Sequence, residues 1–102
     1  MFVLGIDPGL SRCGYGCVEG GRGGAVRAVG LGVLTTPTTA SLPERLAALR
    51  TELAELVAEF KPDVVAVERV FFQVNVRTAM SVGQVSGLAL AEAWASGCEV
   101  VQ

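Results

Sequence analysis

The feature that most constrains the fold is an amphipathic helix that is followed at once by a short apolar strand. Ser41 and Glu44 form an S-x-x-E capping box, which predicts the start of the helix. Apolar side chains then recur at steps of four and three residues and form one stripe: Leu42, Leu46, Leu49, Leu53, Leu56 and Phe60. Pro62 ends the helix, because the residue before a proline avoids the helical region. The run Asp63–Glu68 has an apolar centre without alternation, which predicts a central strand covered on both faces.

Three strands are predicted before this helix. Residues 2–6 form an apolar run that stops at the turn Asp7-Pro8-Gly9. Residues 14–19 and 26–34 form two more runs, joined by the glycine-rich connection at 20–24. Because the connections are short, we predict an antiparallel meander for these strands.

The remainder of the chain continues the alternation of helix and strand. We predict a loop from Arg69 to about Val76, a helix from about Arg77 to Ala95 and a fifth strand at 99–102. This order predicts an α/β domain with a mixed five-stranded sheet flanked by helices. A length of 102 residues fits a single domain over residues 1–102. The final strand has nothing to cover it, so we expect a fragment that is incomplete at its C-terminus.

Composition argues against several protein classes. No apolar run reaches the ~18 residues of a membrane span, and the first residues lack the basic region of a secretory signal. The chain has no histidine, and its three cysteines (Cys13, Cys17 and Cys98) form no CxxC pair, which argues against zinc. Unpaired cysteines without an export signal predict the reducing cytoplasm. Cys13 and Cys17 are interpreted as small strand residues.

The net charge of −2, taken alone, argues against a nucleic-acid partner. The distribution of charge weakens that conclusion. Four of the ten acidic residues lie on the first predicted helix: Glu44, Glu52, Glu55 and Glu59. Five arginines lie in or near predicted turns and loops: Arg12, Arg22, Arg27, Arg69 and Arg77.

Two carboxylates stand out by position, because Asp7 follows the first predicted strand and Glu68 ends the fourth. If these strands are adjacent and parallel, both acids lie at the edge where open α/β sheets place their sites. Two like charges held together raise a pKa or require a cation. With no histidine or paired thiol to compete, Mg²⁺ is the natural ion. Equally, Asp7 could be only a turn residue that binds its own backbone, and Glu68 only a solvated residue after a buried strand.

Two ordered motifs resemble a known family. The chain resembles the RuvC-type Holliday-junction resolvases in Leu4-Gly5-Ile6-Asp7-Pro8-Gly9 with Gly14-Tyr15-Gly16, and in Pro62-Asp63 with Glu68-Arg69-Val70-Phe71. The likeness continues through Asn75-Val76-Arg77-Thr78-Ala79 and Gly83-Gln84, and so covers nearly the whole chain.

The resemblance implies a ribonuclease H-like fold and hydrolysis of DNA phosphodiesters at four-way junctions, in recombination and repair. Asp7 and Glu68 would be catalytic ligands for Mg²⁺ or Mn²⁺, with two ions in the complete domain. The family pattern has two more site residues, usually acidic, on a C-terminal helix beyond Gln102. The resemblance therefore implies that residues 1–102 supply only part of the family's site.

The resemblance also indicates residues that contact DNA. Phe71 matches an aromatic residue that family members present to bases near the junction centre, where stacking contributes ~1–3 kcal/mol per base. Arg69, Asn75 and Arg77 are the further candidates for DNA contacts. The alternative is that Phe71 or Phe72 packs beneath the loop and that the arginines are merely solvated.

The second predicted helix carries a small residue at every fourth position: Ala79, Gly83, Gly87 and Ala91. Each internal glycine costs up to ~1 kcal/mol relative to alanine, and a close approach to the sheet or to a second chain would offset that cost. In the family this helix contributes to the dimer interface, with Met80, Gly83, Gly87 and Leu88 as candidates and Trp94 as a further anchor. A homodimer suits the near two-fold symmetry of a junction that is cut twice. The RuvA and RuvB branch-migration proteins are implied partners.

Three other functions compete with this one. An actin-like or sugar-kinase-like ATP-binding half-domain also opens with a strand, an aspartate and a glycine loop. It would need a Ser/Thr-lined phosphate loop, whereas Ser11 is the only hydroxyl close after Gly9. A RuvC-like pre-16S ribosomal RNA nuclease would lack the second acidic motif and the segment after it. The third is a catalytically inactive DNA-binding or dimerisation module.

Overall fold

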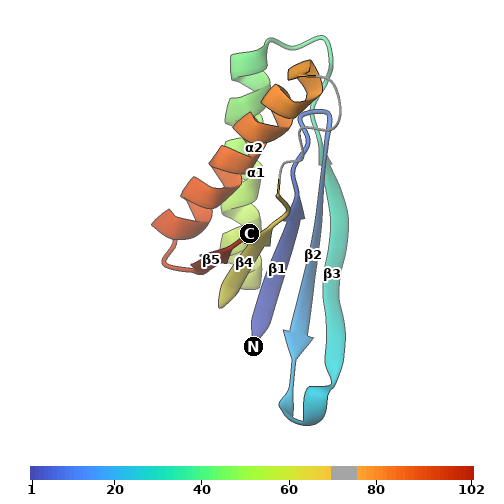
Figure 1. Ribbon diagram of the computed structural model, residues 1–102, viewed down its shortest axis with the longest axis vertical. Coiled ribbons are helices and arrows are strands. Elements are labelled where there is room, and N and C mark those ends of the chain that lie inside the picture. The colour runs from blue at the N-terminus through green and yellow to red at the C-terminus, as the bar shows by residue number, and fades with distance from the viewer. Residues whose placement is uncertain (70–75) are drawn as a thin grey trace.

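In the computed structural model, which describes residues 1–69 and 76–102, five strands form one sheet and two helices pack against it (Figure 1). The strands lie in the order β3-β2-β1-β4-β5. The elements in chain order are β1 (Phe2–Asp7), β2 (Arg12–Gly20), the short 3₁₀ helix η1 (Arg22–Gly24), β3 (Val26–Thr35), α1 (Leu42–Phe60), β4 (Val64–Val67), α2 (Val76–Ala95) and β5 (Glu99–Val101).

The pairing of the strands confirms the predicted mixed sheet. β1, β2 and β3 form an antiparallel meander, whereas β4 runs parallel to both β1 and β5. The glycine-rich connection forms η1, with Gly23 and Gly24 at φ of 82° and 79°, a region that glycine adopts without strain. β2 begins two residues earlier than predicted, because Arg12 still pairs with Thr35 of β3.

The sequence signals at both ends of α1 are confirmed. The Ser41 hydroxyl accepts a hydrogen bond from the Glu44 amide (3.4 Å) and donates one to the Glu44 carboxylate (2.9 Å). Lys61 adopts the left-handed conformation (φ 46°), and its amide donates to the Val57 carbonyl (2.9 Å). The predicted apolar stripe is buried in its middle, whereas Leu42 at the start of the helix is exposed.

The core lies between one face of the sheet and both helices. Alternate strand residues point into it, including Leu4, Ile6, Cys13, Cys17, Val65 and Val67. The helices contribute Leu49, Leu53, Leu56 and Val57 from α1, and Val85, Ala89 and Ala93 from α2. Cys13, Cys17 and Cys98 are free thiols, and the first two fill core positions as expected. Among the described residues, no helix is long and apolar enough to cross a membrane.

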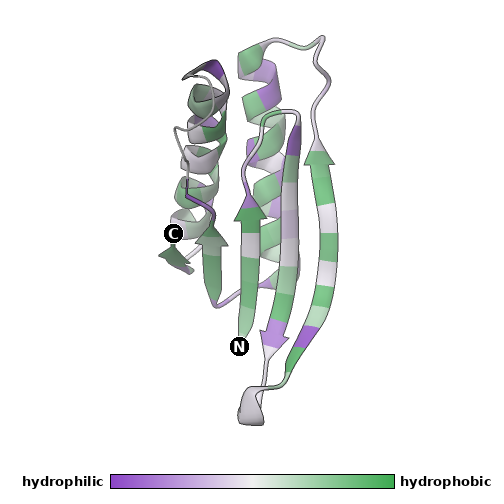
Figure 2. Cartoon of the chain, turned by 45° about the vertical axis from the view of Figure 1, so that its right-hand side comes forward, coloured by the Kyte–Doolittle hydropathy of each residue, from purple (hydrophilic) through white to green (hydrophobic). Residues whose placement is uncertain are grey.

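The other face of the sheet is open, and this corrects one prediction. Val64 and Ala66 of β4 are only half-buried, so within the described residues β4 is covered on one face instead of two. Figure 2 shows that many residues along β1 and β3 are apolar, and on the open face the lining includes the apolar residues Leu31, Val33 and Ala66. Leu31 and Val33 of β3 are exposed there.

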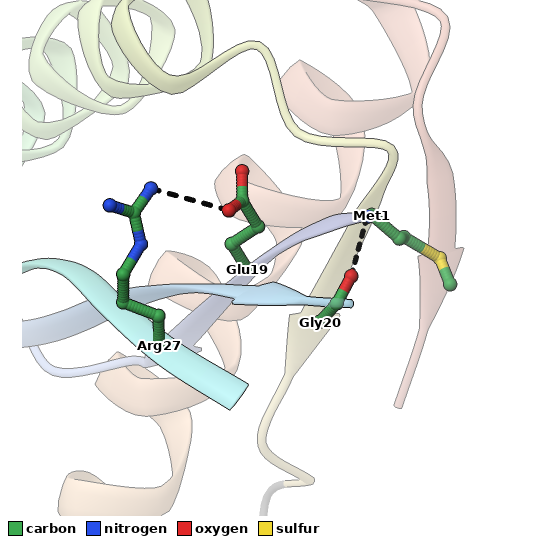
Figure 3. A network of polar contacts seen from close by, with 4 residues as sticks. All are labelled: Met1, Glu19, Gly20 and Arg27. Carbon is green, nitrogen blue, oxygen red and sulfur yellow. Dashed lines mark hydrogen bonds and ion pairs between the residues drawn. The ribbon is translucent and has the colours of Figure 1, made fainter. Parts of the chain in front are cut away.

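At the end of the sheet where β1 and β4 begin, which we call the opposite edge, several polar groups are paired. The Met1 ammonium group donates to the Gly20 carbonyl (2.9 Å), and Arg27 lies 3.2 Å from the Glu19 carboxylate (Figure 3). The Phe2 amide donates to the carboxylate of Asp63 (2.8 Å), the residue just before β4. This hydrogen bond from the Phe2 amide to Asp63 holds the start of β1 next to the start of β4.

Candidate active site

Asp7 and Glu68 lie side by side at the end of the sheet where β1 and β4 finish, which we call the carboxyl edge. The last paired residues of the two parallel strands are Ile6 and Val67, and each acid is the next residue along its strand. The Glu68 amide donates to the Ile6 carbonyl (3.0 Å), which extends the ladder by one step. Ile6 and Val67 point into the core, so by alternation both carboxylates point to the open face.

The two carboxylates interact directly. A side-chain hydrogen bond with Asp7 and the negative charge of Asp7 raise the pKa of Glu68, and a little desolvation adds to the effect. Both side chains are exposed. Two carboxyl groups that share one proton in this way can lose that proton and bind a cation in its place.

The donor atoms at this edge fit a hard divalent cation. Two carboxylate groups supply only oxygen ligands, the kind that Mg²⁺ and Mn²⁺ prefer. The nearby thiol of Cys13 does not compete: burial raises its pKa, as do the charges of Asp7 and Glu52, against a hydrogen bond with the Gly9 backbone. Within the described residues, no cluster of three or more His, Cys, Asp or Glu gathers.

A groove of about 890 Å³ runs over the open face of the sheet and reaches both acids. Its floor is smooth, because glycines occupy the centre of β1 and β2 at Gly5, Gly14 and Gly16. Leu31 and Val33 form one wall, and Ala66 lies on the other side. The groove is thus an apolar trough with a pair of carboxylates at one end.

The loop after Asp7 is held by a residue that sequence reasoning missed. Arg45, in the first turn of α1, donates from Nε to the Thr36 hydroxyl (2.9 Å) and from Nη2 to the Ser11 hydroxyl (2.8 Å). Thr36 in turn donates to the Leu10 carbonyl (2.6 Å). A side chain at Gly9 would clash with the Arg12 carbonyl, so the loop is also tight. One signal in the sequence was available: a cation near a helix N-terminus is disfavoured by the helix dipole.

Four arginines lie at the carboxyl edge: Arg12 at the start of β2, Arg45 in α1, Arg69 just after β4 and Arg77 in the first turn of α2. None of the four forms an ion pair with a described residue. By contrast, Arg27 pairs with Glu19, and Arg50 on α1 pairs with Glu92 on α2 (2.9 Å). The predicted candidates Arg69 and Arg77 are both exposed at this edge. Phe71 and Asn75 lie outside the described residues.

The two glycines of the α2 stripe do not pack on the sheet, so the alternative of a close approach to the sheet was wrong for Gly83 and Gly87. Gly83 and Gly87 are exposed, and an added Cβ would meet nothing within 4 Å, whereas Ala79 is buried. The reason is geometric: four residues advance about 40° beyond a full helical turn, so the stripe winds from the core to the surface. Met80 (61% exposed) and Trp94 (77% exposed) flank the exposed glycines. The candidate Leu88 is half-buried against the core.

Comparison with known proteins decides the family. The family model described as "Crossover junction endodeoxyribonuclease RuvC" matches residues 3–102. The chain belongs to the RuvC family. RuvC of Saccharopolyspora erythraea is 52% identical over 88 residues, which is 86% of this chain and 44% of that protein. The chain thus spans about half the length of the curated RuvC relatives that it matches.

Solved structures confirm the fold. T. thermophilus RuvC in complex with a Holliday junction substrate matches with a TM-score of 0.89 and 32% identity, over 98% of this chain and 61% of that one. The yeast mitochondrial Holliday junction resolvase Ydc2 matches with a TM-score of 0.71 over 98% of this chain and 50% of its own, and its 19% identity shows the fold alone. The ribonuclease H-like α/β fold is therefore confirmed, and the RuvC family is favoured over the ATP-binding alternative.

Proposed function

We propose that this chain forms the part of a crossover junction endonuclease that holds its metal and the DNA backbone. The supporting observation is the contact between Asp7 and Glu68 at the ends of two adjacent parallel strands. The substrate would be a four-way DNA junction in recombination and repair, since a RuvC relative of known structure was solved with such a junction.

Asp7 and Glu68 would hold Mg²⁺ or Mn²⁺ on the open face of the sheet. By holding two such ions, these carboxylates would supply Lewis-acid chemistry that polarises the phosphodiester and stabilises charge on its oxygens. The two carboxylates position the ions and keep them beside the strand that is cut. The parallel pairing of β1 and β4 beneath the two carboxylates fixes the distance between the carboxylates. That distance would position the reacting atoms.

The arginines of the carboxyl edge explain how an acidic chain can bind DNA. Arg12, Arg69 and Arg77 are exposed without a carboxylate partner among the described residues. Unpaired arginines are available to phosphates, whereas the paired Arg27 and Arg50 are not. Phe71 and Asn75 are proposed to contact the bases and the backbone of the DNA.

The open groove is proposed to receive the helix that carries the two further site residues implied by the resemblance. Its glycine floor would let a helix approach closely, with its acids reaching toward Asp7 and Glu68. Residues 1–102 then behave as one unit of a domain completed by that helix. Binding without cleavage is the second candidate function, because only two carboxylates of the described residues meet at this edge.

A homodimer through α2 would place two sites on one junction. On the surface of α2, the large side chains of Met80 and Trp94 lie on either side of the exposed Gly83 and Gly87. Leu88 lies at the border of the same surface. A two-fold interface brings the same patch of both copies together. RuvA and RuvB are the further partners that the resemblance implies, and the cytoplasm is the proposed compartment.

The test is nicking of a synthetic four-way junction and of plain duplex in Mg²⁺, by this chain and its Asp7→Asn and Glu68→Gln variants. We expect junction-selective nicks that fall on the order of a hundredfold in either variant, because each loses a metal ligand. Glu59→Gln, on the exposed surface of α1, is the matched control and should cut normally. Selective binding without nicks would support the binding module. Nicks that persist in both variants would contradict the proposed site.

A further inference from the structure

Arg45 has more hydrogen-bond donors than the chain uses. A guanidinium group carries five N–H donors, and Arg45 uses two of them, on Thr36 and Ser11. Its side chain is half-buried, yet no carboxylate of the described residues forms an ion pair with it. Partly buried charges are normally paired. The remaining donors of Arg45 therefore suit an anion supplied from outside the chain.

Ser11 adds a donor at the same place. The Ser11 oxygen accepts a hydrogen bond from Arg45, which leaves the hydroxyl proton of this exposed residue free to be donated. A guanidinium group and a hydroxyl match an anion with several acceptor oxygens, and arginine forks match phosphate in particular.

We propose that Arg45 and Ser11 form a subsite for a phosphate of the DNA strand next to the phosphate held at Asp7 and Glu68. This subsite rests on the proposed nuclease function. The loop that carries Ser11 starts directly after Asp7, and Arg45 and Thr36 fix its position. A strand of duplex DNA carries a phosphate every ~3.4 Å of helix axis, so a strand at the carboxylate pair passes this loop. The subsite would set the register of the strand that is cut.

The experiment measures the affinity of the chain for a labelled four-way junction and for plain duplex as a function of salt, without divalent cations. Each phosphate contact contributes about 0.9 to the slope of log K against log salt. Arg45→Gln should therefore lower the slope by about one and weaken binding at low salt about tenfold. Arg50→Gln removes the same charge from the same helix, where Arg50 pairs with Glu92, and should leave the slope unchanged.

Two more variants separate a phosphate contact from a purely structural role. Arg45→Lys keeps the charge and should keep the slope, while its affinity falls because the planar fork is lost. Thr36→Val removes one hydrogen bond to Arg45 but no charge, and should also keep the slope. If Arg45→Gln does not fold by circular dichroism, Ser11→Ala replaces it: this variant removes an exposed hydroxyl of the subsite, so binding at low salt should weaken while the slope stays unchanged, and unchanged binding would overturn the subsite.

The outcomes distinguish the subsite from the proposed function. An unchanged slope in Arg45→Gln together with a preference for the junction overturns the subsite alone. A reduced slope on both DNAs, without preference for the junction, supports the subsite and counts against junction recognition. A chain with no affinity for either DNA overturns both.

Discussion

The two ends of the sheet differ in whether their charged groups have partners of opposite charge or hydrogen-bond partners. At the opposite edge, Met1, Arg27 and Asp63 each have a partner within hydrogen-bond distance. At the carboxyl edge, two carboxylates share one place, and the arginines around them lack carboxylate partners among the described residues. Paired groups stabilise a fold. Unpaired like charges that lie together reduce its stability, and they can bind a ligand of opposite charge. The comparison supports the proposal that the functional site lies at the carboxyl edge.

The largest effect on stability is expected at the opposite edge. Asp63→Ala leaves the Phe2 amide without its 2.8 Å acceptor, which should lower the free energy of unfolding by about 1 kcal/mol. For a domain of this size the Tm would fall by about 4–8 °C. Thermal unfolding followed by circular dichroism measures it, with the exposed Glu59→Ala as control. If DNA binding fell as much as stability did, the division between the two ends would be wrong.

A smaller effect of opposite sign is expected at the carboxyl edge. The pKa of Glu68 is raised in the folded chain, so between the unfolded and folded values the folded state binds more protons. The free energy of unfolding should therefore fall as pH rises through that window, and the cost persists above it. Asp7→Asn should remove this slope and stabilise the metal-free chain at neutral pH. Urea unfolding at a series of pH values measures the slope, and a slope that survives Asp7→Asn would count against the coupled pair.

The smallest effect is expected for Arg27→Gln. The ion pair with Glu19 spans 3.2 Å between exposed side chains, and such pairs contribute at most ~1 kcal/mol and often nothing measurable. The Tm should change by less than for Asp63→Ala, and added salt should erase the difference. A large loss of stability would show that this pair is more than a surface contact.

Local sequence patterns determined most of the fold. The capping box, the leucine stripe and Pro62 predicted α1, because these signals act within one or two helical turns. The apolar runs and glycine turns predicted the strands and their meander. The position of Asp7 and Glu68 at strand ends predicted that they would meet, since parallel neighbours end at the same edge.

The tertiary structure decided how these elements face one another. Arg45, Thr36 and Ser11 meet only because α1 begins at the same end of the sheet as the loop after β1, and no local pattern encodes that meeting. The drift of a four-residue repeat around α2 turned Gly83 and Gly87 to the surface. The apolar run of β4 could not predict that one of its faces is open. Such a run indicates that burial is favourable, but it does not indicate which segment covers each face of the strand. The sequence by itself thus determined the elements, their order and the acid pair, whereas packing between distant segments decided which surfaces remain exposed.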